Sequence, residues 1–350
     1  MNGNLVILGI ETSCDETSAA VVRGGREVLS CVVHTQPEHR QWGGVVPELA
    51  SRCHAERLPG IVRAAVESSG AGWAGIDAVA ATRGPGLASS LLVGWSMAKG
   101  IALAAGRPLV AVNHIEAHLH SVFLDPAAPP PEECRPMVGL AVSGGHTSLF
   151  SVDRDGAVSL VGRTVDDAAG EALDKAAKLL GLGYPGGPVI DRISRGLVPD
   201  EGVFPEGRLH GGAAPGGLDP ELCTSFSGLK TSLLHRVRTS PPKSGAEVAQ
   251  LACDYQAAVV GALVRRCGLA LDRTGARFLA VGGGVSLNSS LRERLKDMCE
   301  KRGVRLLLAL PKHCGDNAAM IAGLAGAGKG VPSPQSFDLD VAPSWPVSGR

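Results

Sequence analysis

The stretch that decides the fold is Leu5-Val-Ile-Leu-Gly-Ile10, with the polar run Glu11-Thr-Ser-Cys-Asp-Glu-Thr-Ser18 and the apolar run Ala19-Ala-Val-Val22 behind it. Apolar runs on either side of a loop of small polar residues are typical of two strands joined as a hairpin. Because the loop residues are small, the loop can face a phosphate group. We therefore expect the chain to begin with a hairpin whose loop belongs to a binding site.

The same pattern returns further along the chain. Met137–Val142 is an apolar run, Ser143-Gly-Gly-His-Thr147 is a loop, and Ser148–Val152 is the returning run. Thr17-Ser18 and Thr147-Ser148 hold the same place in the two hairpins, at an offset of 130 residues. Two hairpins of one design predict an internal repeat.

The segments behind each hairpin repeat as well. In both halves a strand leads through a tight glycine loop to a helix that begins with Ser-Ser-Leu, at an offset of 200 residues. The strands are Ile76–Ala81 and Phe278–Val281, and the helices begin at Ser89 and Ser289. A last strand closes each half, at Pro108–Val112 before His114 and at Arg305–Leu310 before Asp316.

A duplicated α/β unit with facing hairpin loops is typical of the actin, hexokinase and sugar-kinase-like (ASKHA) fold, in which two lobes enclose a central cleft. We expect the first lobe to hold residues 1–113 and about 326–350. The second lobe is expected over residues 114–325, with an insertion at about 165–248. His114 and Asp316 follow equivalent strands, so that they are expected to converge from opposite lobes.

Composition narrows the class of protein. Lys+Arg and Asp+Glu both number 34, so no overall basic charge points to nucleic acid, although a local patch can suffice. None of the nine cysteines forms a C-x-x-C pair, which favours reduced thiols and a cytoplasmic location. Apolar runs are interrupted by charges such as Glu11 and Lys99, so we expect no signal peptide and no membrane span.

The stretch His114-Ile-Glu-Ala-His118 carries a candidate metal site. Histidines four residues apart lie on one face of a helix, within reach of one ion, although the same spacing also arises without a metal. Asp316 is the expected third ligand. Glu116 stands two residues from each histidine, unlike the zinc-protease signature, in which a glutamate directly follows the first histidine. Two histidines and a carboxylate suit Zn²⁺ and Fe²⁺ alike.

Eight strings, taken together, resemble one family. It is the universal tRNA adenosine threonylcarbamoyltransferase family of the bacterial TsaD type, formerly described as O-sialoglycoprotein endopeptidase. The resemblance runs from residue 5 to about residue 347. The strings are Gly9–Thr17, Gly43–Ser51, Gly84-Pro-Gly-Leu87, His114–His118, Ser143–Thr147, Tyr184-Pro-Gly-Gly-Pro188, Ser225-Phe-Ser-Gly-Leu-Lys-Thr231 and Asp316-Asn317.

The resemblance implies an ASKHA fold and an acyltransferase. The family transfers a threonylcarbamoyl group from threonylcarbamoyl-adenylate to N6 of adenosine 37 in tRNAs that read ANN codons, and AMP leaves. It implies metal ligands at His114, His118 and Asp316, through which these residues are catalytic, and a supporting acidic pair at Asp15 and Glu16. The implied contacts to the adenylate are Ala141, Val142, Ser143, Gly144, Gly145, Asp174, Gly187, Asp191 and Asn288.

The residue types fit these roles, and each also has a plainer interpretation. Glycines at Ser143–Gly145 let backbone N–H groups approach a phosphate. Asp174 and Asp191 can accept hydrogen bonds from ribose hydroxyls. In the plainer interpretation, Asp174 is an exposed helix residue and Asp191 interacts with the dipole at the N-terminus of its helix. Asn288 offers the donor and acceptor that adenine requires, or caps the helix behind it.

Partners and competing functions complete the expectations. Arg292–Arg305 holds six Lys/Arg against three acids, which indicates a solvated helix or a tRNA contact. The resemblance implies an inactive paralogue and a small P-loop ATPase as partner subunits. A metal-dependent peptidase and an ATPase or kinase of the same fold are the alternatives. The position of Glu116 disfavours the first, and metal-binding histidines disfavour the second.

Overall fold

The computed structural model describes residues 4–200, 202–209 and 214–347. These residues form two compact units, the first from residues 4–130 and 309–347 and the second from residues 131–308. The limits differ from the expected ones, because residues 114–130 and 309–325 belong to the first unit. His114, His118 and Asp316 therefore lie in one unit, and the expectation that they come from opposite lobes is wrong.

The first unit is built on a six-stranded sheet with the order β11-β5-β4-β1-β2-β3. Strands β1, β2 and β3 form antiparallel pairs, whereas β4 and β5 run parallel to β1. The expected first hairpin is β1 and β2. The strands are β1 (Val6–Glu11), β2 (Glu16–Arg23), β3 (Glu27–Thr35), β4 (Ala78–Gly84), β5 (Leu109–Asn113) and β11 (Val331–Pro332).

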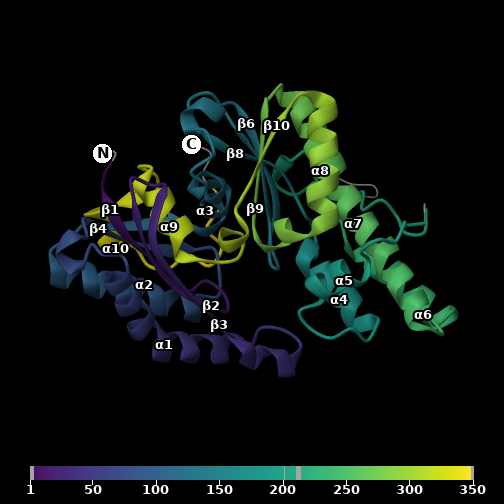
Figure 1. Ribbon diagram of the computed structural model, residues 1–350, viewed down its shortest axis with the longest axis horizontal. Helices are drawn as coiled ribbons and strands as arrows, with labels where there is room; N and C mark the ends of the chain where they lie inside the picture. Colours follow the sequence, from purple (N-terminus) through teal and green to yellow (C-terminus); the bar gives the residue numbers. More distant parts are fainter. Residues whose placement is uncertain (1–3, 201, 210–213, 348–350) are drawn as a thin grey trace. The chain divides into compact units, whose positions relative to one another are not determined.

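Helices cover both faces of this sheet, because successive strand side chains point to opposite sides. Leu8 and Ile10 pack into one cluster with α1 (Pro47–Ser68) and α2 (Ala88–Ala105). Ile7 and its neighbours pack into the other cluster with α9 (Ala318–Gly326) and α3 (His114–His120). Figure 1 shows α1 and α2 together on one side of the strands. The short helix α10 (Gln335–Asp338) lies beside β11.

Helix α2 is, among the described helices, the one long and apolar enough to cross a membrane by length and composition. Core helices of globular proteins meet the same criterion. Trp95, Ala98 and Ala102 are buried in the cluster with the sheet, and the Lys99 Nζ atom donates to the carbonyl of Leu339 at 2.9 Å. One face of α2 thus packs on the sheet, whereas Leu92 and Leu103 on its other face are exposed.

The second unit repeats the strand order of the first. Its sheet runs β10-β9-β6-β7-β8, in which β6, β7 and β8 are antiparallel and β9 and β10 run parallel to β6. This matches β5-β4-β1-β2-β3 strand for strand and confirms the predicted repeat. The strands are β6 (Met137–Val142), β7 (Thr147–Val152), β8 (Val158–Arg163), β9 (Phe278–Gly282) and β10 (Arg305–Leu308).

One large core joins this sheet to its helices. Val138, Leu140 and Val142 of β6 face helices of the second unit, with Tyr255 and Phe226 among the largest buried side chains. The insertion adds α4, α5 and α6 to this core. The helices are α4 (Ala169–Leu179), α5 (Gly186–Ile193), α6 (Ser227–Thr239), α7 (Gly245–Thr274) and α8 (Ser289–Arg302).

Behind β10 the chain returns to the first unit. Helix α9 packs on β1 and β2 and contacts α3. The approach is close, because a Cβ on Gly9 would lie 2.4 Å from the carbonyl oxygen of Ala318. Asp316 lies two residues before α9 and is thereby brought to α3.

Candidate functional site

The two histidines of the candidate metal centre lie on a capped helix. Asn113 ends β5, and its Oδ1 accepts hydrogen bonds from the backbone N–H groups of Ile115 and Glu116 at 2.9 and 3.3 Å. This N-cap starts α3 directly behind the strand. The helical spacing then stacks His114 and His118, whose ring centroids are 4.6 Å apart. Both side chains are buried.

Asp316 completes the predicted triad. Its Oδ1 lies 3.1 Å from Nε2 of His118 and 3.6 Å from Nε2 of His114. One ligand atom from each residue can be chosen so that all lie within 4.8 Å of one another. Although it is fully buried, His118 has no hydrogen-bond partner at either ring nitrogen among the described residues. A buried imidazole without a hydrogen bond, beside a second imidazole and a carboxylate, fits a divalent metal ion.

Further carboxylates surround the triad. Oε2 of Glu11 lies 3.0 Å from Nδ1 of His114. Burial lowers the pKa of His114, but the charges of Asp316 and Glu11 outweigh it and raise this pKa to about 9. Burial, Asp316 and Asp15 together raise the pKa of Glu16 well above its usual range. Glu16 of the predicted acidic pair thus lies within electrostatic range of Asp316, and a cation at the triad would relieve the repulsion between these carboxyl groups.

In the second unit, the loop Ser143–Gly145 forms a tight turn between β6 and β7. The N–H of Ser143 donates to the carbonyl of His146 at 2.8 Å, and the N–H of His146 donates to Oγ of Ser143 at 3.2 Å. His146 therefore orders the loop. Ala141 and Val142 are buried at the end of β6, directly before it.

The two glycines of this loop are required neither by packing nor by backbone conformation. Neither Gly144 nor Gly145 has a positive φ. A Cβ added to either would meet no described atom within 4 Å. A side chain there would instead occupy open space above the turn, where a phosphate group could approach the backbone N–H groups. Open space at a Gly-Gly turn is what the predicted phosphate loop requires.

The start of α4 packs against this loop. The N–H of Gly170 donates to the carbonyl of Ser143 at 3.3 Å, and the N–H of Glu171 donates to the carbonyl of Gly144 at 3.2 Å. A Cβ on Gly170 would lie 2.7 Å from the carbonyl oxygen of Ser143, so this contact needs glycine. One turn further along α4 stands Asp174.

Asp174 holds the first turn of α5. Its Oδ1 accepts hydrogen bonds from the N–H groups of Gly186 and Gly187 at 2.7 and 3.2 Å. Burial raises the pKa of Asp174, although these two N–H groups act in the opposite direction. Gly187 leaves room, since an added Cβ would come no closer than 3.8 Å to Leu173.

Asp191 and Asn288 join α5 to the start of α8. Oδ1 of Asp191 accepts from both the N–H and the hydroxyl of Ser289, at 2.9 and 2.7 Å. Oδ1 of Asn288 accepts from the N–H of Leu291 at 2.9 Å, which makes Asn288 the N-cap of α8. Its Nδ2 donates to Oε1 of Gln256 at 2.7 Å.

Hydrogen bonds and helix turns thus link the nine predicted contact residues into one region, at which α4, α5 and α8 all begin. Sequence reasoning missed Glu11, Ser289 and Gln256, which hold His114, Asp191 and Asn288. For Glu11 and Ser289 the only signal in the sequence is position: Glu11 opens the first hairpin loop, and Ser289 directly follows Asn288. Gln256, in the middle of α7, gave no signal.

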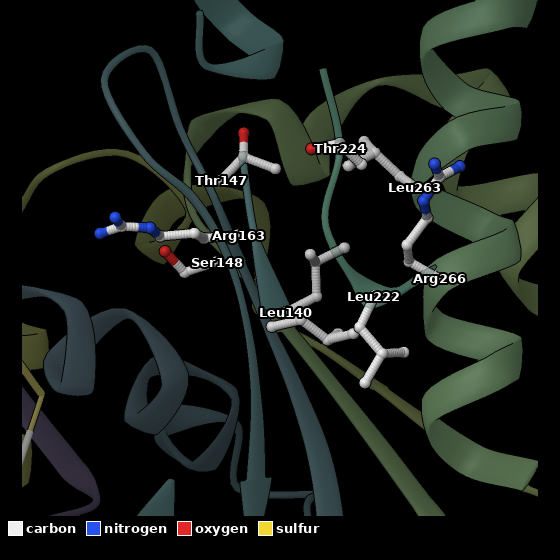
Figure 2. Close-up of a pocket in the computed structure, with 9 residues that line it drawn as sticks. Leu140, Thr147, Ser148, Arg163, Leu222, Thr224, Leu263 and Arg266 are labelled. Atoms are coloured by element: carbon white, nitrogen blue, oxygen red, sulfur yellow. The ribbon is translucent and has the colours of Figure 1, made fainter. Parts of the chain in front are cut away.

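A small cavity elsewhere in the second unit is not this site. Figure 2 shows it between the sheet and α7, with Leu140, Leu222 and Leu263 in its lining. Arg266 also lines it, and its guanidinium donates to the carbonyls of Cys223 and Gly207 at 3.1 and 2.8 Å. None of the nine predicted residues is in the lining, and the arginine serves to tie the preceding loops to α7.

Solved structures share the fold of the chain. The activator of 2-hydroxyisocaproyl-CoA dehydratase from Clostridium difficile matches 93% of this chain and 95% of its own, with a TM-score of 0.54 at 14% identity. HypF from T. kodakarensis matches 93% of this chain and 47% of its own, with a TM-score of 0.58 at 15% identity. Both are ASKHA proteins, which confirms the predicted fold class.

Comparisons of sequence give the family. The chain is 46% identical to the tRNA N6-adenosine threonylcarbamoyltransferase of Trichlorobacter lovleyi, over 98% of this chain and 97% of that protein. It is 48% identical to the enzyme of that name from Anaeromyxobacter dehalogenans, over 97% of this chain and 98% of that protein. The family model TsaD, tRNA N6-adenosine threonylcarbamoyltransferase, matches residues 27–323. With the repeat, the histidine pair and the hairpin loops all in place, the chain belongs to the tRNA N6-adenosine threonylcarbamoyltransferase family.

Proposed function

We propose that the chain transfers the threonylcarbamoyl group of threonylcarbamoyl-adenylate to N6 of adenosine 37 in tRNAs that read ANN codons. The N6–carbonyl carbon bond forms, the bond from that carbon to the phosphate oxygen breaks, N6 loses a proton, and AMP leaves. The observation that carries the proposal is the open Gly144-Gly145 turn, which hydrogen bonds and helix turns link to Asp174, Asp191 and Asn288.

The second unit holds the adenylate. Backbone N–H groups of Gly144 and Gly145 bind the phosphate. Ala141, Val142 and Ser143, whose own N–H bonds the carbonyl of His146, fix the loop at the end of β6. Asp174 and Asp191 accept hydrogen bonds from the ribose, beside Gly187, where the backbone is open. The side-chain amide of Asn288 already bonds Gln256 and caps α8. Its second N–H and the second lone pair of Oδ1 remain to recognise adenine. Since the anhydride is already activated, fixed positioning supplies much of the rate.

The first unit holds the metal ion through His114, His118 and Asp316. A divalent ion bound there, Fe²⁺ or Zn²⁺, supplies a Lewis acid that polarises a carbonyl and neutralises charge on a leaving phosphate. Both imidazoles are buried, and Asp316 contributes the negative charge. Asp15 and Glu16 support this charge balance beside Asp316.

Membership of the family supports a proposal for the cellular setting. We infer that the protein works in the cytoplasm on tRNA, without a membrane, together with an inactive paralogue and a small P-loop ATPase. A metal-dependent peptidase and an ATPase or kinase of the same fold are the competing functions. Neither would form threonylcarbamoyl-modified adenosine in tRNA.

Single-turnover transfer from threonylcarbamoyl-adenylate to unmodified tRNA, with the partner proteins present, tests the function. We expect modified adenosine with the unsubstituted chain and a loss of at least about 100-fold for His114→Ala, His118→Ala and Asp316→Ala, in line with the effects of changing metal-site groups. His120→Gln is the control, because His120 lies on the same helix but its Nε2 contacts the carbonyl of Gly25 at 3.1 Å. Normal transfer in all three triad variants would remove the metal from the mechanism.

A further inference from the structure

We propose that Glu11 is the positioning residue of the metal centre: its carboxylate fixes the ring of His114 so that Nε2 faces the ligand position. This inference rests on the proposed metal site and adds a residue to it. The observation is the 3.0 Å contact between Oε2 of Glu11 and Nδ1 of His114, on the side of the ring opposite to the triad.

Glu11 is itself held rigidly. Its side chain is fully buried at the end of β1. Oε1 accepts a hydrogen bond from the N–H of Ser13 at 2.5 Å, and Oε2 accepts one from the hydroxyl of Thr82 at 2.6 Å. Thr82 lies on β4, which pairs with β1 in the sheet. The carboxylate is therefore fixed by two adjacent strands of the core before it contacts the histidine.

The contact selects the tautomer of His114. A carboxylate oxygen accepts hydrogen bonds, so the proton of the neutral ring belongs on Nδ1 and the lone pair on Nε2. Nε2 is the atom that lies 3.6 Å from Oδ1 of Asp316. The hydroxyl of Ser13, 3.2 Å from the same Nδ1, can accept from it as well. Both neighbours on this side thus accommodate an Nδ1–H group.

His118 provides the contrast. Its Nδ1 has no hydrogen-bond partner among the described residues, so nothing described there orients the second ring. The triad therefore has one histidine oriented from behind by a carboxylate and one, His118, whose polar contact is with Asp316 inside the triad. Carboxylates behind a ligating histidine also increase its basicity, and their loss lowers metal affinity by 10–100-fold, roughly, in known sites. We expect the contribution of Glu11 to fall in this range.

The test is the affinity of the purified chain for Zn²⁺, measured by competition with a chromophoric chelator. Glu11→Ala should weaken binding by about 100-fold, and Glu11→Gln, whose amide oxygen can still accept from Nδ1–H, by about 10-fold. Thr82→Val is the matched control: it removes a hydrogen bond to the same carboxylate but leaves the histidine contact, and should change affinity by less than about 3-fold. Circular dichroism checks that each variant is folded.

A second readout is the nitrogen chemical shifts of the His114 ring in the Zn²⁺-loaded protein, which report the tautomer. The unsubstituted chain should show Nδ1–H with Nε2 bound to the metal. Unchanged affinity in Glu11→Ala, an equal loss in Thr82→Val, or Nε2–H would overturn the role of Glu11. If the unsubstituted chain binds no Zn²⁺, Co²⁺ or Fe²⁺, the proposed metal site itself fails, which is a separate result.

A different observation concerns the partner surface. Residues 222–246 contain four cations, Lys230, Arg236, Arg238 and Lys243, and no acidic residue. Arg236, Arg238 and Lys243 are exposed, and no described carboxylate forms a salt bridge with any of the four side chains. In a chain whose charges balance overall, this is a local concentration of unneutralised positive charge on α6 and the loop behind it.

Helix α8, the basic segment predicted from the sequence, differs in this respect. Arg302 pairs with Asp272 at 3.1 Å, and Lys296 lies 3.9 Å from Glu300. The guanidinium groups of Arg292 and Arg294 donate to the carbonyls of Ser286 and Ala257. Most cations of α8 are thus engaged within the second unit, whereas those of α6 are available to a polyanion.

The geometry points to α6 and Lys243 as a surface that binds the phosphate backbone of RNA, which within the proposed function is the tRNA. Arg236→Glu with Arg238→Glu should raise the Kd for tRNA at least about 10-fold at 0.1 M salt and lower the slope of log K against log salt by about 2. The control reversal on α8, Lys296→Glu with Lys301→Glu, should change the Kd less than about 3-fold.

The outcomes separate the surface from the reaction. An α6 reversal that binds tRNA like the unsubstituted chain, a larger loss from the α8 reversal, or no tRNA binding by the unsubstituted chain would overturn this surface. Both reversals should bind adenylate normally, since neither touches the Ser143–Gly145 loop. Tight, salt-dependent tRNA binding through α6 without transfer would leave the surface in place and contradict the proposed function.

Discussion

The carboxylate of Asp191 holds the first residue of α8, because Oδ1 accepts both the N–H and the hydroxyl of Ser289, at 2.9 and 2.7 Å. Oδ2 lies 3.3 Å from the guanidinium of Arg195. The residue is 7% exposed, and its contacts join two helices of the proposed adenylate site. Asp191 therefore fixes the walls of the proposed adenylate site, in addition to its proposed contact with the ribose.

Removing this carboxylate should weaken adenylate binding and leave the metal centre intact. In Asp191→Ala, α8 loses its link to α5 and the ribose loses an acceptor, so we expect the Kd for a non-hydrolysable adenylate to rise about 10- to 100-fold, the equivalent of one or two hydrogen bonds to a charged group. Calorimetry measures the Kd, and elemental analysis measures the metal. Loss of metal from this variant would mean that the role of Asp191 is misassigned.

The glycine turn allows a test in which stability and binding separate. Gly144→Ala and Gly145→Ala add a Cβ in open space, so we expect the free energy of unfolding to change by less than about 1 kcal/mol. The same Cβ should obstruct the phosphate and weaken adenylate binding at least about 10-fold, which corresponds to about 1.4 kcal/mol.

Gly283→Ala is the matched control on the neighbouring loop. Gly283 has a φ of 98°, and its Cβ would lie 2.3 Å from the carbonyl oxygen of Val142. This variant should therefore lose stability, by about 1–3 kcal/mol, in a denaturant titration. If alanine at Gly144 and Gly145 destabilises as much while binding is unchanged, the turn is structural and the phosphate assignment is wrong.

The sequence predicted the architecture through its repeat, and the wrong part of the division has a physical cause. The hairpins and the strand order follow from local apolar runs and turns, and this pattern occurs twice in the sequence. Helix α9 follows a strand of the second sheet but packs on β1 and β2 of the first. Hydrophobic periodicity indicates that such a helix is buried, but it does not indicate which sheet the helix packs on. Asp316 was therefore placed in the wrong lobe.

The sequence predicted which residues come together at the candidate site more fully than it predicted the contacts between them. His114, His118 and Asp316 come together as the pattern indicated. The plainer interpretation of Asn288 as a helix cap also holds. Asp191 was expected in the first turn of its own helix, but it is the sixth residue of α5 and bonds the start of α8 instead. Glu11 was missed because a carboxylate in a polar hairpin loop gives no sign that it ends buried against a histidine 103 residues away.

Metal binding should stabilise the first unit. Because the folded protein presents three ligands and the unfolded chain does not hold them together, Zn²⁺ at 100 times its Kd should add about 2.7 kcal/mol to the free energy of unfolding. We expect a Tm shift of several degrees for the unsubstituted chain, measured by scanning calorimetry with and without chelator, and no shift for His118→Ala. Asp219→Asn, at an exposed ion pair with Arg273, is the control and should keep the shift. A full shift in His118→Ala would place the ion elsewhere.

The stability of the fold should fall in mild acid, with His313 as one cause. This ring is 1% exposed and has no hydrogen-bond partner among the described residues at either nitrogen. Burial, with the nearby Lys312, lowers the pKa of His313 to about 4. The unfolded chain takes up this proton near its usual pKa of about 6.5, so stability is full above that pH and is lost as the pH falls toward 4. Between pH 7 and pH 5 the loss from this group should be about 2 kcal/mol. Urea titrations of His313→Gln should show a drop smaller by that amount, whereas an equal drop in both proteins would show that His313 does not couple folding to pH.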